Sequence, residues 1–264
     1  MHLKEIGFRD FPQGQTEEHP FRIPVIRSLK SLVLDQPVTI LVGENGCGKS
    51  TLLETIAVAA GSVAVGGNSI ERDESLAQAK LLSKYLRLSW IKRTHRGFFM
   101  RSEDFFNFAR RVREEQSELK NLADEAGQKF KGYGRLLAVG AALGQSYALE
   151  AKYGKDLDAN SHGESFLKLF QGRLVPDGFY ILDEPEAPLS PVRQMAFIAM
   201  IQDCVKEGSQ FLIATHSPIL MGYPGAKILN IDGKSISSVQ YEDLEHVKIT
   251  KAFLNNPASF LKHL

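Results

Sequence analysis

Residues 43–50 read Gly43-Glu44-Asn45-Gly46-Cys47-Gly48-Lys49-Ser50, and they join the apolar run 38–42 to the helix-forming run 51–57. This order of strand, glycine-rich loop and helix is the context in which the pattern G-x-x-x-x-G-K-[ST] binds phosphate. Glycines permit the positive backbone dihedrals that turn successive N–H groups toward an anion. The new helix adds its unpaired N-terminal amides and the positive end of its dipole. The segment therefore predicts a nucleotide-phosphate site.

Two side chains of this loop have specific expected roles. Lys49 should reach the β- and γ-phosphates, and the Ser50 hydroxyl should bind Mg²⁺. The predicted nucleotide-binding residues are Gly43, Glu44, Asn45, Gly46, Cys47, Gly48, Lys49, Ser50 and Thr51. The alternative is a glycine-rich turn with no ligand, and the completeness of the motif argues against it.

Length and composition limit the class of protein. The chain has 264 residues, of which 43% are hydrophobic, and this suffices for a single domain over residues 1–264. With 32 basic and 31 acidic residues the formal net charge is +1, so no overall field draws the protein to nucleic acid or to a membrane. Two distant cysteines, Cys47 and Cys204, suggest neither a disulfide nor a zinc framework, which favours the cytoplasm. Because no apolar run approaches about 18 residues, we expect no membrane insertion.

The order of the expected elements predicts an α/β fold with a mainly parallel sheet flanked by helices. Residues 178–182 and 210–214 are apolar, strand-like runs, and the amphipathic segment 191–206 lies between them. The runs 3–8 and 21–25 suggest strands of an N-terminal antiparallel portion.

A helical lobe is expected to be inserted in this sheet domain over residues 102–172. Apolar residues recur at helical spacing from residue 103 into the 120s, which predicts a long amphipathic helix, and residues 136–143 suggest a second, buried one. Just before the lobe, residues 86–91 and 97–100 resemble the two strands of a hairpin with a basic tip.

Two acidic residues follow the apolar strand 179–182, and a histidine follows the next strand. Asp183 can hold Mg²⁺ through water, and Glu184 can polarise the water that attacks the γ-phosphate. His216 comes after the strand 210–214, from where an imidazole can reach the same phosphate. Taken singly, the acids are more often a helix cap and the histidine a loop residue. Their combination with a phosphate loop favours catalytic roles for Glu184 and His216.

A second anion site is predicted at Ser161-His162-Gly163-Glu164-Ser165, which precedes the helical run 166–170. If this segment belongs to the lobe, it cannot fold back onto the phosphate loop of the same chain. The alternative is a capping box in which Ser161 is the N-cap and Glu164 lies three residues later. Both interpretations can hold together.

These four motifs, in this order, resemble those of the ABC-class P-loop ATPases, and the resemblance covers nearly the whole chain. Asp183 and Glu184 match the acidic strand of that family, and His216 matches its switch histidine. The residues that resemble the signature motif are Ser161, Gly163 and Glu164, with Asn160 and His162 in place of the usual leucine and first glycine. The resemblance implies that this motif binds the ATP of a second copy.

Residues 183–194 place the chain in one branch of that family. They resemble Asp-Glu-Pro-Glu-x-x-Leu-His-Pro-x-x-Gln of the soluble, non-transporter ATPases around OLD, RecF and SMC, whereas transporter subunits usually read Ser-Ala-Leu-Asp there. The Ser-His-Gly-Glu-Ser segment is similar to that of small stand-alone bacterial ATPases.

The chain departs from the family pattern in two places. No glutamine occurs near residues 100–103, where the family has its glutamine loop, so Glu103 or Ser102 is a candidate metal contact instead. No aromatic residue is clearly placed to stack on adenine. The candidates are Phe8, Phe11 and Phe21, and core packing is the alternative for each.

The expected activity is Mg²⁺-dependent hydrolysis of ATP by a homodimer that closes around two ATP molecules and separates after hydrolysis. One alternative is a nucleotide-gated interaction module with negligible turnover. Others are the ATPase subunit of a transporter, which the segment 183–194 disfavours, and a nuclease of the OLD kind, for which about 50 residues after His216 are too few. A protein partner is compatible with this sequence, and nothing in it supports binding of nucleic acid.

Overall fold

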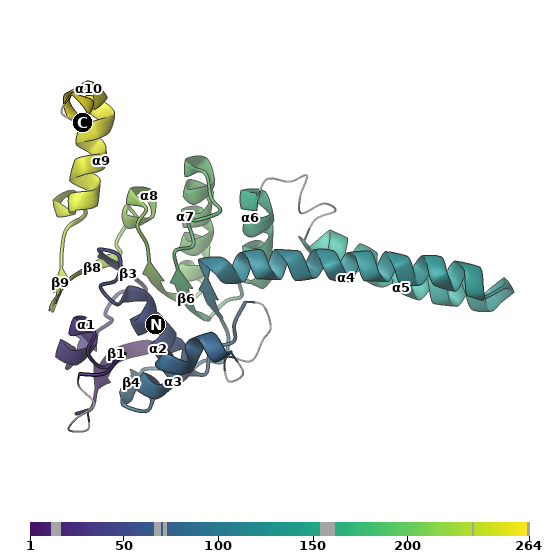
Figure 1. The fold of residues 1–264 in the computed structure, drawn as a ribbon, viewed down its shortest axis with the longest axis horizontal. Helices are drawn as coiled ribbons and strands as arrows, with labels where there is room; N and C mark the ends of the chain where they lie inside the picture. Colours follow the sequence, from purple (N-terminus) through teal and green to yellow (C-terminus); the bar gives the residue numbers. More distant parts are fainter. Residues whose placement is uncertain (12–16, 66–69, 71–72, 154–161, 234, 263–264) are drawn as a thin grey trace.

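The computed structural model describes residues 1–11, 17–65, 70, 73–153, 162–233 and 235–262. Within these residues the strands form a six-stranded sheet in the order β5-β6-β7-β3-β8-β9 and a three-stranded sheet in the order β2-β1-β4. Helices cover the larger sheet, and one helical hairpin extends far from it (Figure 1). The predicted α/β fold with a mainly parallel sheet and an antiparallel N-terminal portion is confirmed.

The larger sheet is parallel except for its last strand, β9, which pairs antiparallel with β8. Its strands are β5 (Phe99–Arg101), β6 (Phe179–Asp183), β7 (Gln210–Ala214), β3 (Val38–Gly43), β8 (Lys227–Asp232) and β9 (Ser235–Ser238). Every residue of β3, β6 and β7 is buried, as expected for parallel strands covered on both faces. The carboxyl ends of these three strands therefore meet at one edge of the sheet.

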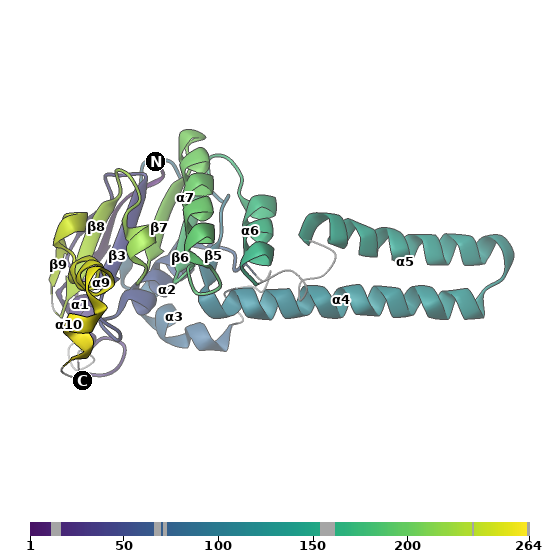
Figure 2. The same ribbon diagram turned by 90° about the horizontal axis from the view of Figure 1, so that it is seen from above.

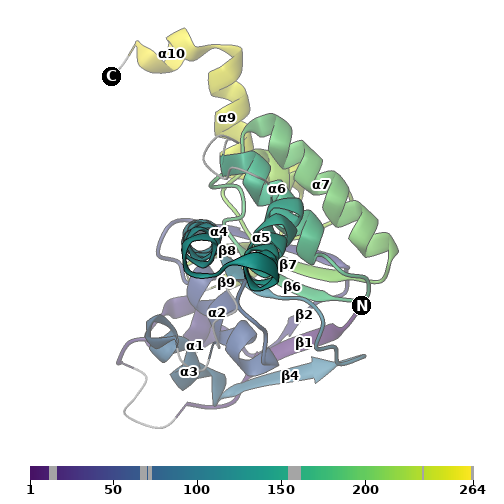
Figure 3. The same cartoon turned by 90° about the vertical axis from the view of Figure 1, so that its right-hand side faces the viewer.

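Two hydrophobic cores lie on opposite faces of this sheet. One contains Leu52 and Ile56 of α2 (Lys49–Ala60) together with Ile181 of β6. The other contains Tyr180 and Leu182, which alternate with Ile181 along the same strand. Figure 3 shows the small antiparallel sheet on one side of the main sheet and α6 and α7 on the other. The elements that complete the two layers are β1 (Leu3–Phe8), β2 (Leu32–Val33), β4 (Leu86–Trp90), α1 (Pro24–Ser28), α3 (Ala77–Ser83), α6 (His162–Arg173) and α7 (Pro191–Lys206).

The helical hairpin consists of α4 (Ser102–Lys129) and α5 (Gly132–Tyr153), which run side by side away from the sheet (Figure 2). The predicted long helix is confirmed as α4. Residues 136–143 are helical as predicted, but their expected burial is wrong, because Leu136 and Leu137 are 70% and 56% exposed. The division into one domain with an inserted lobe over residues 102–172 stays a prediction.

The predicted hairpin of residues 86–91 and 97–100 is wrong. β4 pairs with β1 in the small sheet, whereas β5 pairs in parallel with β6 in the large one. Phe98, Phe99 and Met100 are all buried, and such an uninterrupted apolar run suits a strand covered on both faces. Gly97 has φ +107°, and a Cβ there would lie 1.9 Å from the Phe179 carbonyl oxygen, so the chain passes β6 too closely for a side chain.

The remaining segments follow β7 and β9. They are α8 (Pro218–Met221), α9 (Glu245–Asn255) and α10 (Pro257–Leu261). The predicted terminal hairpin is confirmed as β8 and β9, whereas the expected strand over residues 21–25 is wrong because α1 begins at Pro24. Within the described part of the chain, no helix combines the length and the apolar character needed to cross a membrane.

Candidate functional site

The phosphate loop joins β3 to α2 in the predicted way. Gly43, Gly46 and Gly48 have φ of +149°, +77° and +102°, which residues with a side chain rarely adopt. At Gly48 a Cβ would also lie 2.7 Å from Ile23 Cγ2, so this position has no space for another residue. The loop is thus fixed by backbone conformation and by the segment that leads into α1.

The Lys49 side chain is 5% exposed and folds over the loop. Its Nζ donates hydrogen bonds to the carbonyl oxygens of Gly43 at 2.8 Å and Glu44 at 2.9 Å. These carbonyl dipoles hold the ammonium at the floor of a cavity of about 470 Å³. The residues that line this cavity are Asn45, Gly46, Gly48, Lys49, Ser50, Thr51, Glu184, His19, Arg22, Ile23 and Pro24.

His19 and Arg22 also line this cavity, and no sequence motif had singled them out. They lie in the turn-rich segment before α1, whose only visible signal was its proline, glycine and glutamate content. Arg22 adds a second basic residue beside Lys49, which suits an anionic ligand.

Asp183 ends β6 close to Ser50, as expected from the parallel sheet. The carboxyl is 7% exposed, and burial raises its pKa to about 6, although a hydrogen bond from the Ser50 hydroxyl opposes this rise. Asp183 Oδ1 is buried without a hydrogen-bond partner among the described residues. A hydroxyl next to an unsatisfied carboxylate oxygen fits Mg²⁺, which takes few protein ligands and completes its shell with water and phosphate oxygens. The described residues contain no cluster of three or more His, Cys, Asp or Glu that could hold a metal ion.

Glu184 and His216 come together at the same edge of the sheet. β6 and β7 pair with Asp183 beside Ala214, so the residues that follow these strands are neighbours. The distance from His216 Nε2 to Glu184 Oε1 is 3.8 Å. Burial, and next the charge of Lys49, lower the pKa of His216, which favours the neutral imidazole. A neutral imidazole can either donate or accept a hydrogen bond at this position.

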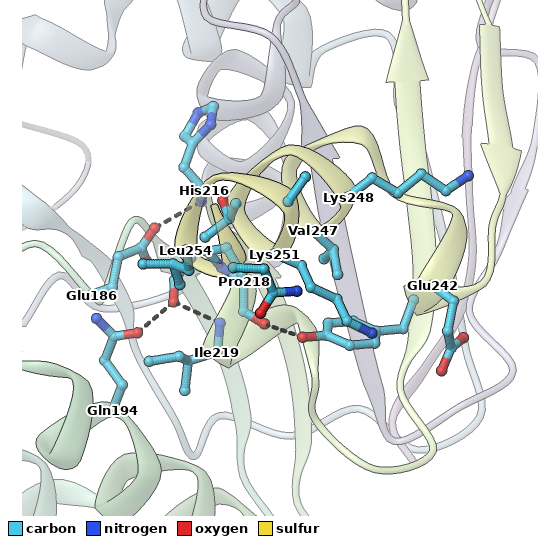
Figure 4. A pocket seen from close by; sticks show the side chains of 15 residues that line it. Glu186, Gln194, His216, Pro218, Ile219, Glu242, Val247, Lys248, Lys251 and Leu254 are labelled. Atoms are coloured by element: carbon cyan, nitrogen blue, oxygen red, sulfur yellow. Dashed lines mark hydrogen bonds between the residues drawn. The ribbon is translucent and has the colours of Figure 1, made fainter. Parts of the chain in front are cut away.

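A third acidic residue, Glu186, holds the histidine loop in place. The backbone N–H of His216 donates to Glu186 Oε1 at 2.7 Å (Figure 4). Burial raises the pKa of Glu186, and a hydrogen bond with the Thr215 side chain opposes this rise. In the sequence, Glu186 was noted only as part of the motif at residues 183–194. Its contact with His216 joins two loops that are distant in the chain, and no local sequence pattern predicts such a contact.

The predicted signature motif is described only in part. Ser161 lies outside the described residues, and α6 begins at the next residue. Gly163 packs closely against the segment after β6, because a Cβ there would lie 2.8 Å from the Pro188 carbonyl oxygen and 2.7 Å from Arg193 Cδ. Glu164 forms an ion pair with Lys168 at 2.9 Å. Neither Gly163 nor Glu164 is among the described residues that line the phosphate cavity.

Profiles of AAA domains match most of this chain. One described as "AAA domain" matches residues 8–131, and one described as "AAA domain, putative AbiEii toxin, Type IV TA system" matches residues 78–222, more than half of the chain. The chain belongs to this AAA-domain family.

Curated relatives and solved structures agree with this membership. The cobalt import ATP-binding protein CbiO of Salmonella typhimurium is 27% identical over 199 residues, which are 73% of this chain and 66% of the relative. CbiO of Salmonella typhi is 28% identical over 197 residues, with 71% and 66% covered. The ATP-binding cassette MJ1267 of an ABC transporter matches with a TM-score of 0.50 and 16% identity, over 100% of this chain and 99% of that structure. The predicted ABC-class P-loop ATPase fold is confirmed, and the family supports ATP binding and hydrolysis in general.

In this AAA-domain protein an arginine, Arg101, lies within residues 100–103, where the family resemblance implies a glutamine loop and the sequence has no glutamine. Arg101 ends β5 beside Asp183, and its side chain is 12% exposed. Its guanidinium lies 3.0 Å from carboxylate oxygens of Asp73 and Asp104, 3.2 Å from one of Glu103 and 3.7 Å from one of Glu54. Glu103, the candidate metal contact, is 64% exposed and paired with Arg101, and its role at a metal stays a prediction.

The three candidate aromatic residues for adenine pack on one another. Phe11 lies 5.4 Å from Phe8 and 5.2 Å from Phe21 between ring centroids, and Tyr85 completes the cluster. Phe21 is 5% exposed. Phe21 belongs to one hydrophobic core, and Phe8 and Phe11 are partly buried and pack against that core, which favours the packing alternative.

Proposed function

We propose that this chain hydrolyses ATP with Mg²⁺, and that two copies close around two ATP molecules. The observation that carries the proposal is the position of Glu184, which lines the phosphate cavity together with Lys49 and lies 3.8 Å from His216. A base and a phosphate-binding lysine at one cavity, with an imidazole next to the base, are the groups that hydrolysis of a γ-phosphate requires.

Each group has a separate task in this proposal. Backbone N–H groups of the loop and Lys49 hold the phosphates, and Ser50 and Asp183 hold Mg²⁺, which supplies charge stabilisation when bound. Glu184 is 43% exposed toward the cavity and takes the proton of the attacking water. His216 orients that water or the γ-phosphate through its neutral ring.

The dimer follows from the separation of the two anion-binding motifs. Gly163 and Glu164 belong to α6, and neither lines the cavity formed by the phosphate loop within the described residues. In a two-fold dimer the motif at 161–164 of one copy faces the ATP of the other, so the same contact forms twice. Hydrolysis then removes the γ-phosphate that joins the two surfaces, and the copies separate.

Single-turnover hydrolysis tests the catalytic part of the proposal. Glu184→Gln keeps the shape of the side chain but cannot take up a proton, so we expect the rate of the chemical step to fall at least about a hundredfold while ATP still binds. Glu207→Gln, at an exposed carboxylate after α7, is the matched control and should keep the wild-type rate. If wild type and Glu184→Gln both bind ATP without cleaving it, the nucleotide-gated module is the better description.

One observation favours a second candidate, the ATPase subunit of a transporter. The curated relatives are named cobalt import ATP-binding proteins, although only about two thirds of their length is matched. Reconstitution with membrane proteins from the same operon discriminates between the two: hydrolysis that is stimulated by a permease supports the transporter subunit.

A further inference from the structure

The backbone of the histidine loop is held firmly from two sides. The N–H of His216 donates to Glu186, and the Ser217 hydroxyl accepts from the Ile219 N–H at 3.1 Å where α8 begins. Ser217 Oγ also hydrogen-bonds Gln194 of α7 (Figure 4). These bonds fix the position of His216 Cα, but they leave the orientation of the imidazole undetermined.

The imidazole itself has few contacts that could orient it. Its Nε2 is buried and, among the described residues, has no hydrogen-bond partner, since Glu184 Oε1 at 3.8 Å is too distant. The ring of His246 approaches it with a centroid distance of 5.6 Å and an interplanar angle of 57°. His216 is thus placed between the proposed base and a residue of α9.

His246 lies at a fixed place because the start of α9 is anchored. Leu244 and Val247, on either side of it in sequence, are 4% and 8% exposed and belong to the core. The Tyr241 hydroxyl donates to the Pro218 carbonyl oxygen at 3.1 Å, which ties the approach to α9 to the histidine loop. The two rings therefore belong to segments that are bonded to each other.

The imidazole has space to turn away. A cavity of about 1120 Å³ lies beneath α9, and its lining includes His216, Val247, Lys251 and Leu254 (Figure 4). This cavity leaves space for another rotamer of the His216 side chain. The ring of His246 is a contact that can keep the imidazole beside Glu184.

We propose that His246 is a positioning residue, which holds the imidazole of His216 beside Glu184 and so makes α9 part of the hydrolytic apparatus. The inference rests on the proposed ATPase function, in which His216 contacts the γ-phosphate or the water. His246 acts through ring packing, so its shape matters more than its ring nitrogens. A partner that moves α9 would then change the rate of hydrolysis.

The test is steady-state hydrolysis by His246→Ala and His246→Phe at saturating ATP. Contacts between ring pairs of this kind correspond to about three- to tenfold in rate, so kcat of His246→Ala should fall by that factor while KM for ATP changes less than about twofold. His246→Phe keeps a ring and should recover most of kcat. Ile249→Ala, one turn along α9 at a residue that is 51% exposed, is the control and should behave as wild type.

A double-mutant cycle with His216→Ala shows whether the effect passes through His216. The double variant should be no slower than His216→Ala alone, and the melting temperature of His246→Ala should equal that of wild type. An unchanged kcat in His246→Ala, additive losses, or a loss that His246→Phe does not recover would each overturn the positioning role. If His216→Ala itself retains wild-type kcat, or if wild type does not hydrolyse ATP, the proposed function fails together with the positioning role. The other negative outcomes overturn the positioning role alone and leave the proposed function intact.

Discussion

Lys49 is the residue on which ATP binding depends most in this account. Its ammonium is held by two carbonyl oxygens at the floor of the phosphate cavity, and Lys49→Ala removes that charge. We expect the variant to fold but to lose the rise in melting temperature that ATP gives to wild type, because a ligand stabilises only the state that binds it. Lys206→Ala, at an exposed lysine of α7, is the control and should keep the full shift. An equal ATP shift in Lys49→Ala would contradict the phosphate-loop assignment.

Glu54 gives a prediction about stability and pH. Burial raises the pKa of this carboxyl from 4.5 to about 7, and the charge of Arg101 offsets only part of the rise. Because the folded-state pKa is the higher one, the native state binds more protons between these values, and stability falls as pH rises through them. At pH 8, Glu54→Gln should therefore unfold at a higher urea concentration than wild type, with a free energy of unfolding that is larger by about 1–3 kcal/mol. At pH 5 the difference in free energy should be smaller. Glu74→Gln, at an exposed carboxylate, is the control and should unfold like wild type. Equal free energies of unfolding for wild type and Glu54→Gln at both pH values would disprove the argument.

The sequence was informative where the residues of a site are adjacent in the chain. The loop at 43–50 and the pair Asp183 and Glu184 could be predicted because each follows a buried strand, and parallel strands bring their ends together. Contacts between distant segments gave no such signal. Arg101 with Glu54, and His216 with His246, are contacts that only the folded chain defines.

At the scale of elements, Arg101 connects the phosphate-loop helix to the base of the helical hairpin. It contacts Glu54 of α2, Asp73 before the 3₁₀ turn Glu74–Leu76, and Asp104 in the first turn of α4. Arg101→Met would leave several partly buried carboxylates without their cation, which should lower the free energy of unfolding by about 2–4 kcal/mol. Urea unfolding measures this loss, and Arg87→Met, at an exposed residue of β4, is the control. A loss no larger than that of Arg87→Met would mean that the cluster does not secure α4.

Elements were predictable when burial and periodicity agreed. β7 and α7 have the expected bounds, and β6 lies one residue later than expected, at 179–183 instead of 178–182. Their apolar patterns were informative because both strands are covered on two faces and the helix on one. α5 shows how the same reasoning fails. Its seam with α4 is built from small residues such as Ala123, Ala126 and Ala142, so larger side chains such as Leu137 remain outside. The apolar run 136–143 therefore predicted the helix correctly, but it predicted the burial of that helix wrongly.

In the proposed mechanism of the whole molecule, two copies of the chain share each ATP. The phosphate loop precedes α2, whereas Gly163 and Glu164 lie in the first turn of α6. The hairpin α4–α5 comes between these two elements in the chain and projects away from the sheet (Figure 2). Gly163→Asp is a poor probe of the dimer, since a side chain there meets the Pro188 carbonyl and Arg193 within its own copy. Ser161→Glu adds a negative charge to the motif without altering Gly163. Ser117→Glu, on the exposed side of α4, adds the same charge elsewhere and serves as its control.

Sedimentation velocity of Glu184→Gln with ATP and Mg²⁺ measures whether two copies of the chain share ATP. Blocking hydrolysis should trap the closed state, so we expect a monomer without nucleotide and a dimer with ATP. Adding Ser161→Glu should return the protein to the monomer because like charges oppose the γ-phosphate, whereas adding Ser117→Glu should leave the dimer intact. A protein that stays monomeric with ATP would contradict the shared-nucleotide mechanism. So would a protein whose dimerisation depends neither on ATP nor on the substitution Ser161→Glu.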